Sequence, residues 1–274
     1  MQSDNRGIVI EGTGPMRVWR RSDVPIATVV ETLAAPGDTL KRNRKSLTKR
    51  VGDFVVKSSE GAFAIQLIKH TALRQRYRCG WYAALFLEQH DIPAPRPVAH
   101  VEWERAGAIW RHATITEYLH DCVDVEHFYD AKVTSGAPRG ELAAYLARLA
   151  TAVNALTASG AVHTDLAGKN ILTRNGETFW FIDLDGIVLS GTFRTEDTGG
   201  TAGVAFDDTR RFTCHVQLYD SFIDRCDDTL LAPFLEAMLP KDYPRFETWF
   251  ARVKSAQAVR RARTVAAWKR EAKR

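Results

Sequence analysis

Alternation of apolar and polar residues is the main pattern from about residue 38 to residue 118, and it predicts the strands of a small sheet. Glycine-containing turns at 51–53 and 105–107 separate neighbouring runs and favour their antiparallel pairing. Five runs have this pattern: Thr39–Leu40, Ser46–Thr48, Phe54–Lys57, Val98–Trp103 and Ile109–Tyr118.

Helical spacing of apolar residues replaces this alternation in three stretches. The first spans about 62–90, and the proline-rich turn at 92–97 must end it because proline lacks a backbone donor. The second carries an apolar stripe over 142–156 and ends at Gly160, and the third covers about 207–239. A strand-rich part followed by a helical part predicts an α+β chain.

A polar sequence with a defined order follows the second predicted helix. It reads H-x-D-L-x-x-x-N-I-L from His163 to Leu172 and D-x-D-G from Asp183 to Gly186, which is the order of a kinase catalytic loop and metal-binding loop. Phosphoryl transfer needs a carboxylate that orients the attacking hydroxyl and accepts its proton. Asp165 is the candidate for this role, whereas we expect His163 to brace the loop as a buried, hydrogen-bonded side chain.

Oxygen ligands for Mg²⁺ complete the candidate catalytic set. Asn170 and Asp183 flank a predicted β-hairpin, in which residues 171–172 and 179–182 pair around an Asn175-Gly176 turn. Because a hairpin brings its two ends together, we expect Asn170 and Asp183 to lie side by side, as ligands of a shared metal ion must. The tripeptide H-x-D alone is common, so the prediction rests on the full order of residues and on the hairpin.

A lysine at the end of the third predicted strand is the candidate phosphate ligand. The strand that ends at Lys57 is similar to the V-A-I-K strand of kinases, in which the ammonium contacts the α- and β-phosphates of ATP; a lysine that leaves a strand for solvent is the alternative. Active kinases hold this lysine with a helix glutamate, but residues 61–87 contain no acidic residue. Glu88 and Asp183 are the remaining candidates for its partner.

Other charged residues have two open assignments each. Residues 116–119 would form a hinge whose backbone groups bind adenine, although Glu117 can equally be an exposed strand-end residue. Lys169 could offset the charge of the transferred phosphate or point into solvent. Arg210 and Arg211 could line an anionic substrate site, or solvate a helix and meet nearby acids.

Composition places the chain among globular proteins that stay inside the cell. It has 274 residues, of which 45% are hydrophobic and 26% charged, and neither a signal-peptide core nor a run long enough to span a membrane. Its four cysteines form no C-x-x-C pair and are expected to be reduced thiols rather than disulfides or zinc ligands. We therefore expect a cytoplasmic protein.

The net charge of +5 is unevenly distributed. Residues 251–274 contain nine Lys or Arg residues and one acid, which gives +8, so the rest of the chain carries −3. A second basic cluster lies at 41–45 and continues to 49–50, where other kinases have a glycine-rich phosphate loop. Such clusters attract phosphate-rich partners or anionic lipid, while a solvated helix face is the alternative for the tail.

In order along the chain, the lysine strand, I-P-A-P-R-P, T-E-Y-L, H-T-D-L-A-G-K-N-I-L and F-I-D-L-D-G resemble the WaaP-like lipopolysaccharide kinase family of bacterial Kdo and heptose kinases. The resemblance covers about 38–225. It implies a two-lobed protein-kinase-like fold, with an N-lobe at 38–118, a C-lobe at 119–250, an N-terminal extension before them and a basic C-terminal helix or tail after them.

The same resemblance implies the use of ATP and Mg²⁺ and the phosphorylation of a lipopolysaccharide core sugar at the cytoplasmic face of the inner membrane. Lys57 would contact ATP, Asp165 would be the base, and Asn170 and Asp183 would hold Mg²⁺. The basic tail and residues 41–50 would draw the protein to an anionic membrane or to substrate phosphates, and no nucleic acid is expected as a partner. A small-molecule or protein kinase, or a pseudokinase that only binds nucleotide, is the alternative function.

Overall fold

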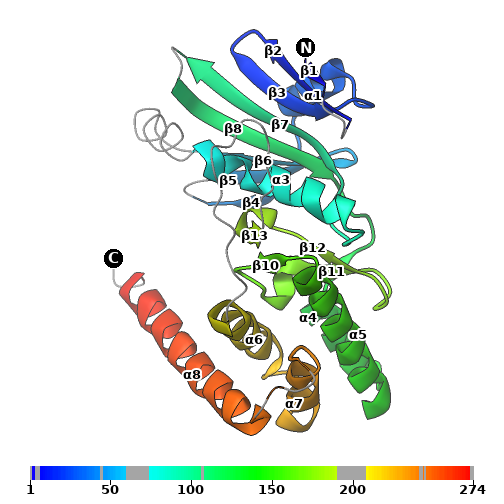
Figure 1. Ribbon diagram of the computed structural model, residues 1–274, viewed down its shortest axis with the longest axis vertical. Helices are drawn as coiled ribbons and strands as arrows, with labels where there is room; N and C mark the ends of the chain where they lie inside the picture. Colours follow the sequence, from blue (N-terminus) through cyan, green and yellow to red (C-terminus); the bar gives the residue numbers. More distant parts are fainter. Residues whose placement is uncertain are drawn as a thin grey trace. The chain divides into compact units, whose positions relative to one another are not determined.

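The computed structural model describes residues 2–3, 7–43, 46–59, 74–105, 108–189, 208–240, 243 and 245–271. It divides the chain into two compact units (Figure 1). The sheet unit contains Met1–His120 and Asp183–Ile187, and the helical unit contains Asp121–Ile182 and Val188–Arg274. The first part of the helix predicted at 62–90 and Arg44 and Lys45 of the basic cluster lie outside the described residues, as does the segment 190–201, whose polar, Gly- and Thr-rich composition predicts a loop.

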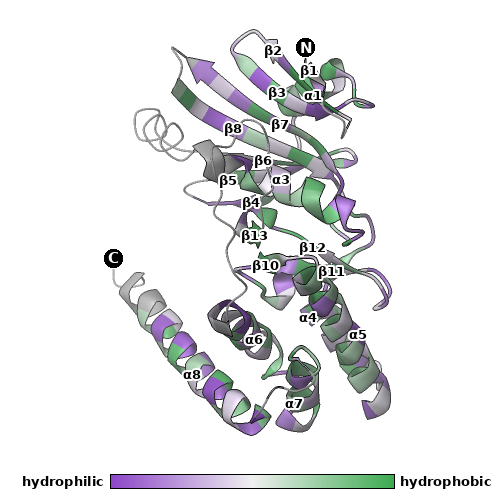
Figure 2. Cartoon of the chain, viewed as in Figure 1, coloured by the Kyte–Doolittle hydropathy of each residue, from purple (hydrophilic) through white to green (hydrophobic). Residues whose placement is uncertain are grey.

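An antiparallel eight-stranded sheet forms the sheet unit, in the order β1-β2-β3-β7-β8-β6-β5-β4. All five predicted strands are confirmed, as β4 to β8. Along them hydrophobic and hydrophilic residues alternate (Figure 2). The strands are β1 (Gln2–Ser3), β2 (Ile8–Thr13), β3 (Met16–Arg21), β4 (Asp38–Arg42), β5 (Ser46–Val51), β6 (Phe54–Ser59), β7 (Pro97–Arg105) and β8 (Ala108–Glu117).

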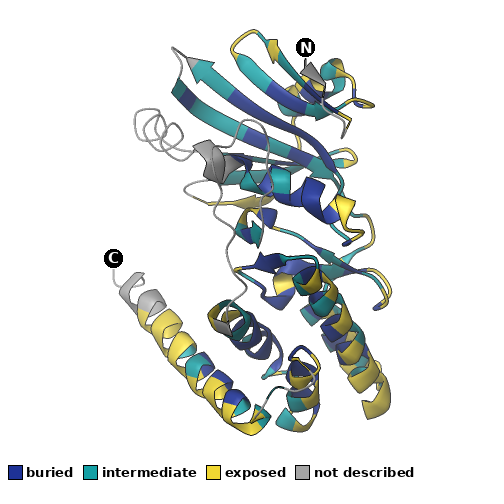
Figure 3. Ribbon diagram, viewed as in Figure 1, coloured by how far each residue is buried: buried dark blue, intermediate teal, exposed yellow. Residues whose placement is uncertain are grey.

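Among the residues that the structure describes, two helices pack on this sheet. Helix α1 (Ile26–Ala34) begins after Pro25, and α3 (Arg74–Gln89) confirms the later part of the first predicted helix. Helix α3 ends as the prolines predict, with Asp91 in the left-handed conformation at φ 55°. Buried residues gather on the inner strands and on α3 (Figure 3). They include Val18, Val56, Trp81, Leu85, Val101 and Ile115.

Five helices form most of the helical unit, and their apolar faces meet in a core of leucine and aromatic side chains. The predicted stripe of the second helix is buried at Tyr145, Leu146, Leu149, Val153 and Leu156. The helix predicted at 207–239 is divided in two, because Asp227 caps a new helix with its side chain. The helices are α4 (Val125–Thr134), α5 (Arg139–Ala158), α6 (Asp208–Phe222), α7 (Asp228–Glu236) and α8 (Phe246–Glu271).

Short strands and single 3₁₀ turns form much of the chain between these helices. Strand β11 pairs with both β12 and β9, and β10 pairs with β13. The bounds are β9 (Val123–Asp124), β10 (Ala161–His163), β11 (Ile171–Thr173), β12 (Phe179–Phe181) and β13 (Ile187–Leu189), with single 3₁₀ turns η1 (Gly168–Asn170) and η2 (Leu184–Gly186).

Candidate active site

The loop between β10 and η1, residues 163–170, contains the predicted base, and we call it the catalytic loop. His163 is buried at its start. The backbone N–H of Asp165 donates to His163 Nδ1 at 3.2 Å, so the ring proton is on Nε2, which donates to the carbonyl oxygen of Ile182 at 2.8 Å. This neutral histidine braces the loop, in agreement with its predicted supporting role.

Asp165 and Asn170 meet inside the catalytic loop. The side-chain nitrogen of Asn170 donates to the carbonyl oxygen of Asp165 at 2.8 Å and to its carboxylate at 3.1 Å. Both bonds use the amide nitrogen, so the side-chain oxygen of Asn170 is directed elsewhere and is the atom suited to a cation. Asn170 is buried while Asp165 is partly exposed, as a group that meets a substrate must be.

The predicted hairpin is confirmed as β11 and β12. Ile171 pairs with Phe181, and the backbone N–H of Ile182 donates to the carbonyl oxygen of Asn170 at 2.9 Å. Gly176 in the turn has φ 77°, a conformation that glycine adopts without strain. Asp183 follows Ile182 directly in the chain and is itself left-handed at φ 57°, a conformation that few non-glycine residues adopt outside functional sites and turns.

Helix α6 fixes the backbone of the catalytic loop with neutral side chains. Gln217 accepts from the N–H of Leu166 at 2.6 Å and donates to the carbonyl oxygen of Thr164 at 3.0 Å. Ser221 accepts from the N–H of Gly168 at 2.9 Å. Both side chains are buried, where an unmade hydrogen bond is costly. Sequence reasoning did not find these positioning residues, since polar residues inside a helix give no signal of burial.

Lys57 on β6 lies in the sheet unit with two carboxylates. Its ammonium bonds to Asp183 and forms an ion pair with Asp185 at 2.6 Å. Burial would lower the pKa of Lys57, but the charges of Asp185 and Asp183 outweigh it and raise that pKa. Of the two predicted partners, Asp183 is confirmed and Glu88 is wrong. Glu88 lies at the exposed end of α3 and pairs with Arg21.

A buried ion pair anchors α3 to the sheet. Arg78 donates to both carboxylate oxygens of Glu102 on β7, at 2.7 and 2.8 Å, and its guanidinium stacks on Trp19. Burial acts to raise the pKa of Glu102, but hydrogen bonds from Arg78 and His100 outweigh it and lower the pKa to about 2. Glu102 is therefore ionised. Its ion pair with Arg78 fixes which face of α3 is directed at η2.

Comparison with known protein families finds a match over the middle of the chain. Residues 46–192, just over half of the chain, match the sequence profile of the lipopolysaccharide kinase (Kdo/WaaP) family. The chain belongs to this family. Membership makes it a phosphotransferase that uses a nucleotide, and it confirms the predicted resemblance. None of the curated proteins matches the sequence of this kinase significantly.

Solved structures place the kinase in the predicted fold class. The structure titled "WaaP in complex with acyl carrier protein" is 18% identical in sequence, with a TM-score of 0.58 over 82% of this chain and 91% of that one. A "Toxoplasma gondii specific rhoptry antigen kinase domain" is 14% identical, with a TM-score of 0.42 over 90% of this chain and 85% of that one. The first of these structures confirms the α+β, protein-kinase-like fold.

The other predicted site residues of the kinase have less specific surroundings. The side chain of Glu117, at the end of β8, pairs with Arg96 at 3.1 Å, and the N–H groups of Glu117 and Tyr118 already donate to backbone carbonyls. Lys169 is exposed, and its backbone N–H donates to Glu126 on α4 at 3.2 Å. Nucleotide contacts by Glu117 and Lys169 stay predictions.

Acids of α6, of α7 and of the turn between them neutralise part of the basic tail. Lys254 pairs with Asp228 at 3.1 Å, Arg260 pairs with Asp220 at 3.5 Å, and Arg261 binds Asp220 and Asp224 at 2.6 and 2.8 Å. The tail is the outer helix α8, and three of its charges are used within the helical unit. Among the described residues no helix is long and apolar enough to cross a membrane, and peripheral membrane contact stays a prediction.

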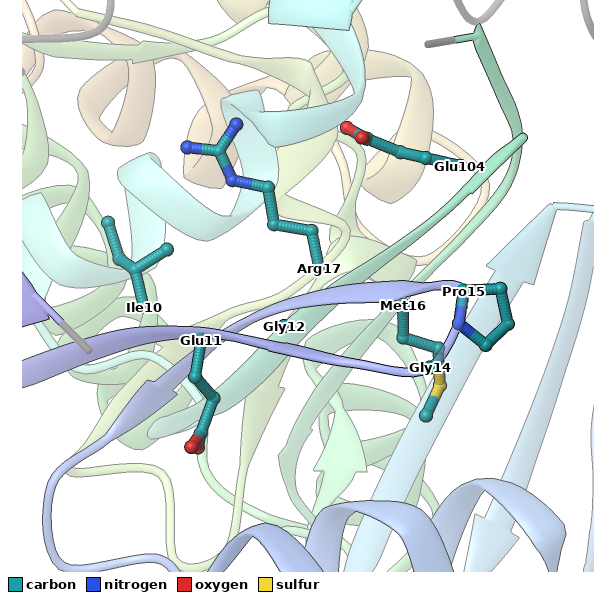
Figure 4. Close-up of a pocket in the computed structure, with 8 residues that line it drawn as sticks. All are labelled: Ile10, Glu11, Gly12, Gly14, Pro15, Met16, Arg17 and Glu104. Carbon is teal, nitrogen blue, oxygen red and sulfur yellow. The ribbon is translucent and has the colours of Figure 1, made fainter. Parts of the chain in front are cut away.

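A separate hollow of about 450 Å³ lies at the β2–β3 turn (Figure 4). Arg17, Glu104 and backbone around Gly14 line it. It contains none of the predicted site residues, and we assign it no part in the reaction. The four cysteines have no disulfide, as predicted.

Proposed function

We propose that the chain transfers the γ-phosphoryl group of ATP to a hydroxyl group of a lipopolysaccharide core sugar, Kdo or heptose. The family that the chain belongs to supports the acceptor class. The observation that carries the chemistry is the bond between Asn170 and the carboxylate of Asp165, since it prepares one side chain for a proton and the other for a cation. The proposal includes a cytoplasmic location with peripheral contact to the inner membrane, because such acceptors are amphiphilic.

Each residue has one task in the proposed reaction. Lys57 binds the nucleotide phosphates with its ammonium, and the carboxylate of Asp165 orients the acceptor hydroxyl and takes its proton. A bond forms between the acceptor oxygen and the γ-phosphorus, and the bond from that phosphorus to the bridging oxygen of ADP breaks. Lys169 is exposed on the same loop as Asp165 and is proposed to offset charge on the transferred group, while Glu117 would offer backbone atoms to adenine.

The donor atoms fit Mg²⁺, which takes oxygen ligands and keeps bound water and phosphate oxygens. Asn170 would offer its side-chain oxygen, because its nitrogen is bonded to Asp165, and Asp183 would offer a carboxylate oxygen. When bound, the ion supplies positive charge that neutralises the phosphates. For the reaction to occur, the nucleotide bound by Lys57 must present its γ-phosphate to the acceptor hydroxyl that Asp165 orients.

Replacing the base tests the proposed function. In Asp165→Asn the side chain can still accept the bond from Asn170 but cannot take a proton. With Mg²⁺ and ATP, phosphate transfer to purified core oligosaccharide should fall roughly 10²- to 10⁴-fold, as for loss of a general base. Mass spectrometry of the oligosaccharide identifies the product and the modified sugar.

Glu236→Gln is the matched control, because it removes one carboxylate charge from an exposed position of the helical unit. It should leave transfer unchanged. Transfer by Asp165→Asn equal to that of the wild type would contradict the enzyme proposal. Mg²⁺-dependent ATP binding without transfer to any offered acceptor would favour the pseudokinase, and transfer only to protein or small molecules would exclude the proposed acceptor.

A further inference from the structure

Gly80 lies inside α3, where a glycine is unfavourable because it orders a flexible backbone without adding side-chain contacts. The space beside it is occupied by the carboxylate of Asp185. A Cβ atom at position 80 would lie 2.2 Å from Asp185 Oδ1, far inside normal contact distance. Any side chain here must displace that carboxylate, so the glycine has a packing reason.

The same carboxylate is an ion-pair partner of Lys57. Asp185 Oδ2 lies 2.6 Å from the Lys57 ammonium, while Oδ1 faces Gly80. Asp185 thus lies between the strand lysine and the helix position opposite it. In active kinases a glutamate of this helix bonds to the strand lysine.

Lys57 contacts two carboxylates, which have different roles in the proposed reaction. Asp183 is the proposed metal ligand, and its charge is then shared with a cation. Asp185 has no such second task. It lies on η2, whose Leu184 is buried, and it approaches the helix through the gap at Gly80. Asp185 can therefore keep Lys57 in place while Asp183 serves the metal.

We propose that Asp185 is a positioning residue that holds Lys57 for phosphoryl transfer in place of a helix glutamate, and that Gly80 admits its carboxylate. This role rests on the proposed kinase reaction. It means that the acid missing from 61–87 has moved from the helix to the loop that follows the β11–β12 hairpin. A chain with this arrangement is equipped for catalysis and need not be a pseudokinase.

Chemical labelling of Lys57 tests the ion pair without any activity measurement. In Asp185→Asn the ammonium loses its ion pair with the Asp185 carboxylate and keeps only its bond to Asp183, so the amine is held less tightly and is more accessible to the reagent. Acylation of Lys57 in the full chain, followed by peptide mass spectrometry, should be faster than in the wild type at the same pH. Glu31→Gln, which removes an exposed carboxylate of α1, should label Lys57 at the wild-type rate.

Moving the carboxylate back to the helix tests the role in catalysis. Asp185→Ala should lower kcat by at least about tenfold, because a misplaced ammonium no longer orients the phosphates. Gly80→Glu alone should also lower kcat, since the new side chain displaces Asp185. Gly80→Glu combined with Asp185→Ala should recover activity relative to either single variant. A role of Asp185 in folding alone would not produce this recovery.

The outcomes separate the inference from the proposed function. Three results would each overturn the role of Asp185. They are labelling of Lys57 at the wild-type rate in Asp185→Asn, a wild-type kcat in Asp185→Ala, and no recovery of activity in the double variant. The kinase proposal survives these results as long as Asp165→Asn still abolishes transfer. If Asp165→Asn transfers normally, the kinase proposal fails, whereas faster labelling would still establish the ion pair.

Discussion

Charges hold the lysine of the sheet unit, whereas the bonds from α6 that hold the catalytic loop of the helical unit are neutral. Lys57 bonds to two carboxylates, and each of these three side chains is at least one-third exposed. The catalytic loop instead depends on Gln217 and Ser221, which are buried and uncharged. Both the ion pairs and the neutral hydrogen bonds position a polar group, but they respond differently to salt, pH and ligands.

This difference suits the two proposed tasks. A lysine that must meet phosphate benefits from partners in reach of solvent, because exposed ion pairs are weak enough to rearrange when a ligand arrives. A loop that presents a base must keep one geometry, and buried neutral bonds do this without the desolvation cost of buried charge. The exception in the sheet unit is Arg78 with Glu102, a buried ion pair that has to keep α3 fixed.

Breaking this buried pair should have the largest effect on stability. Arg78→Met leaves the Glu102 carboxylate fully buried without its guanidinium, which should lower the free energy of unfolding by about 3–5 kcal/mol. Urea unfolding measures the change. Arg21→Met is the matched control, since its pair with Glu88 is partly exposed and should contribute only about 0–1 kcal/mol.

A double variant sharpens this result. Arg78→Met with Glu102→Leu removes both charges and should recover much of the lost stability, because no buried charge is left unpaired. Equal stability of Arg78→Met and the wild type would show that charge does not hold α3. The contrast between the two units would then fail.

Gln217→Leu should have the next largest effect, because it breaks a neutral hydrogen bond in the helical unit. The buried N–H of Leu166 loses its acceptor, at a cost of about 1–3 kcal/mol, and a catalytic loop displaced by about 1 Å can lose roughly 10²-fold in kcat. Urea unfolding and transfer assays measure the two effects. Gln89→Leu, an exposed substitution at the end of α3, should change neither. A stable Gln217→Leu variant with full activity would show that α6 does not position the loop.

The elements that the sequence predicts correctly are those with local signals. The β11–β12 hairpin follows from two apolar runs around Asn175-Gly176. Strands β4 to β8 follow from alternation. The sequence does not predict β2 and β3, because β2 begins with three apolar residues in a row and β3 has three arginines among six residues, so neither alternates clearly.

The missed positions depend on contacts between distant parts of the chain. Gln217 bonds to a residue 51 positions away, and Arg78 bonds to one 24 positions away, so neither pair leaves a sequence period. Asp185 was read only as part of D-x-D-G. One signal was available: a glycine inside an apolar helix, at Gly80, suggests that another group approaches closely.

A fall in pH should destabilise the helical unit before it destabilises the sheet unit. The loss of stability should be gradual. Burial lowers the pKa of His215 on α6 to about 3, against 6.5 for a free histidine, and Trp249 Nε1 donates to its Nδ1 at 2.9 Å. Between these pH values the unfolded chain binds the extra proton. Stability therefore falls with decreasing pH, by up to about 1.4 kcal/mol per pH unit. Glu102 responds later, because its stabilising charge is lost only as pH falls from 4.5 toward 2.

Urea unfolding at pH values between about 7 and 5, a range that includes the pKa of a free histidine, measures the effect of His215. His215→Gln can still accept the bond from Trp249 but does not titrate, so its stability should fall less steeply than that of the wild type. His90→Gln, an exposed substitution at the end of α3, should keep the wild-type slope. Parallel slopes for His215→Gln and the wild type would mean that His215 does not stay neutral in the folded protein. The helical unit would then be no more sensitive to mild acid than the sheet unit.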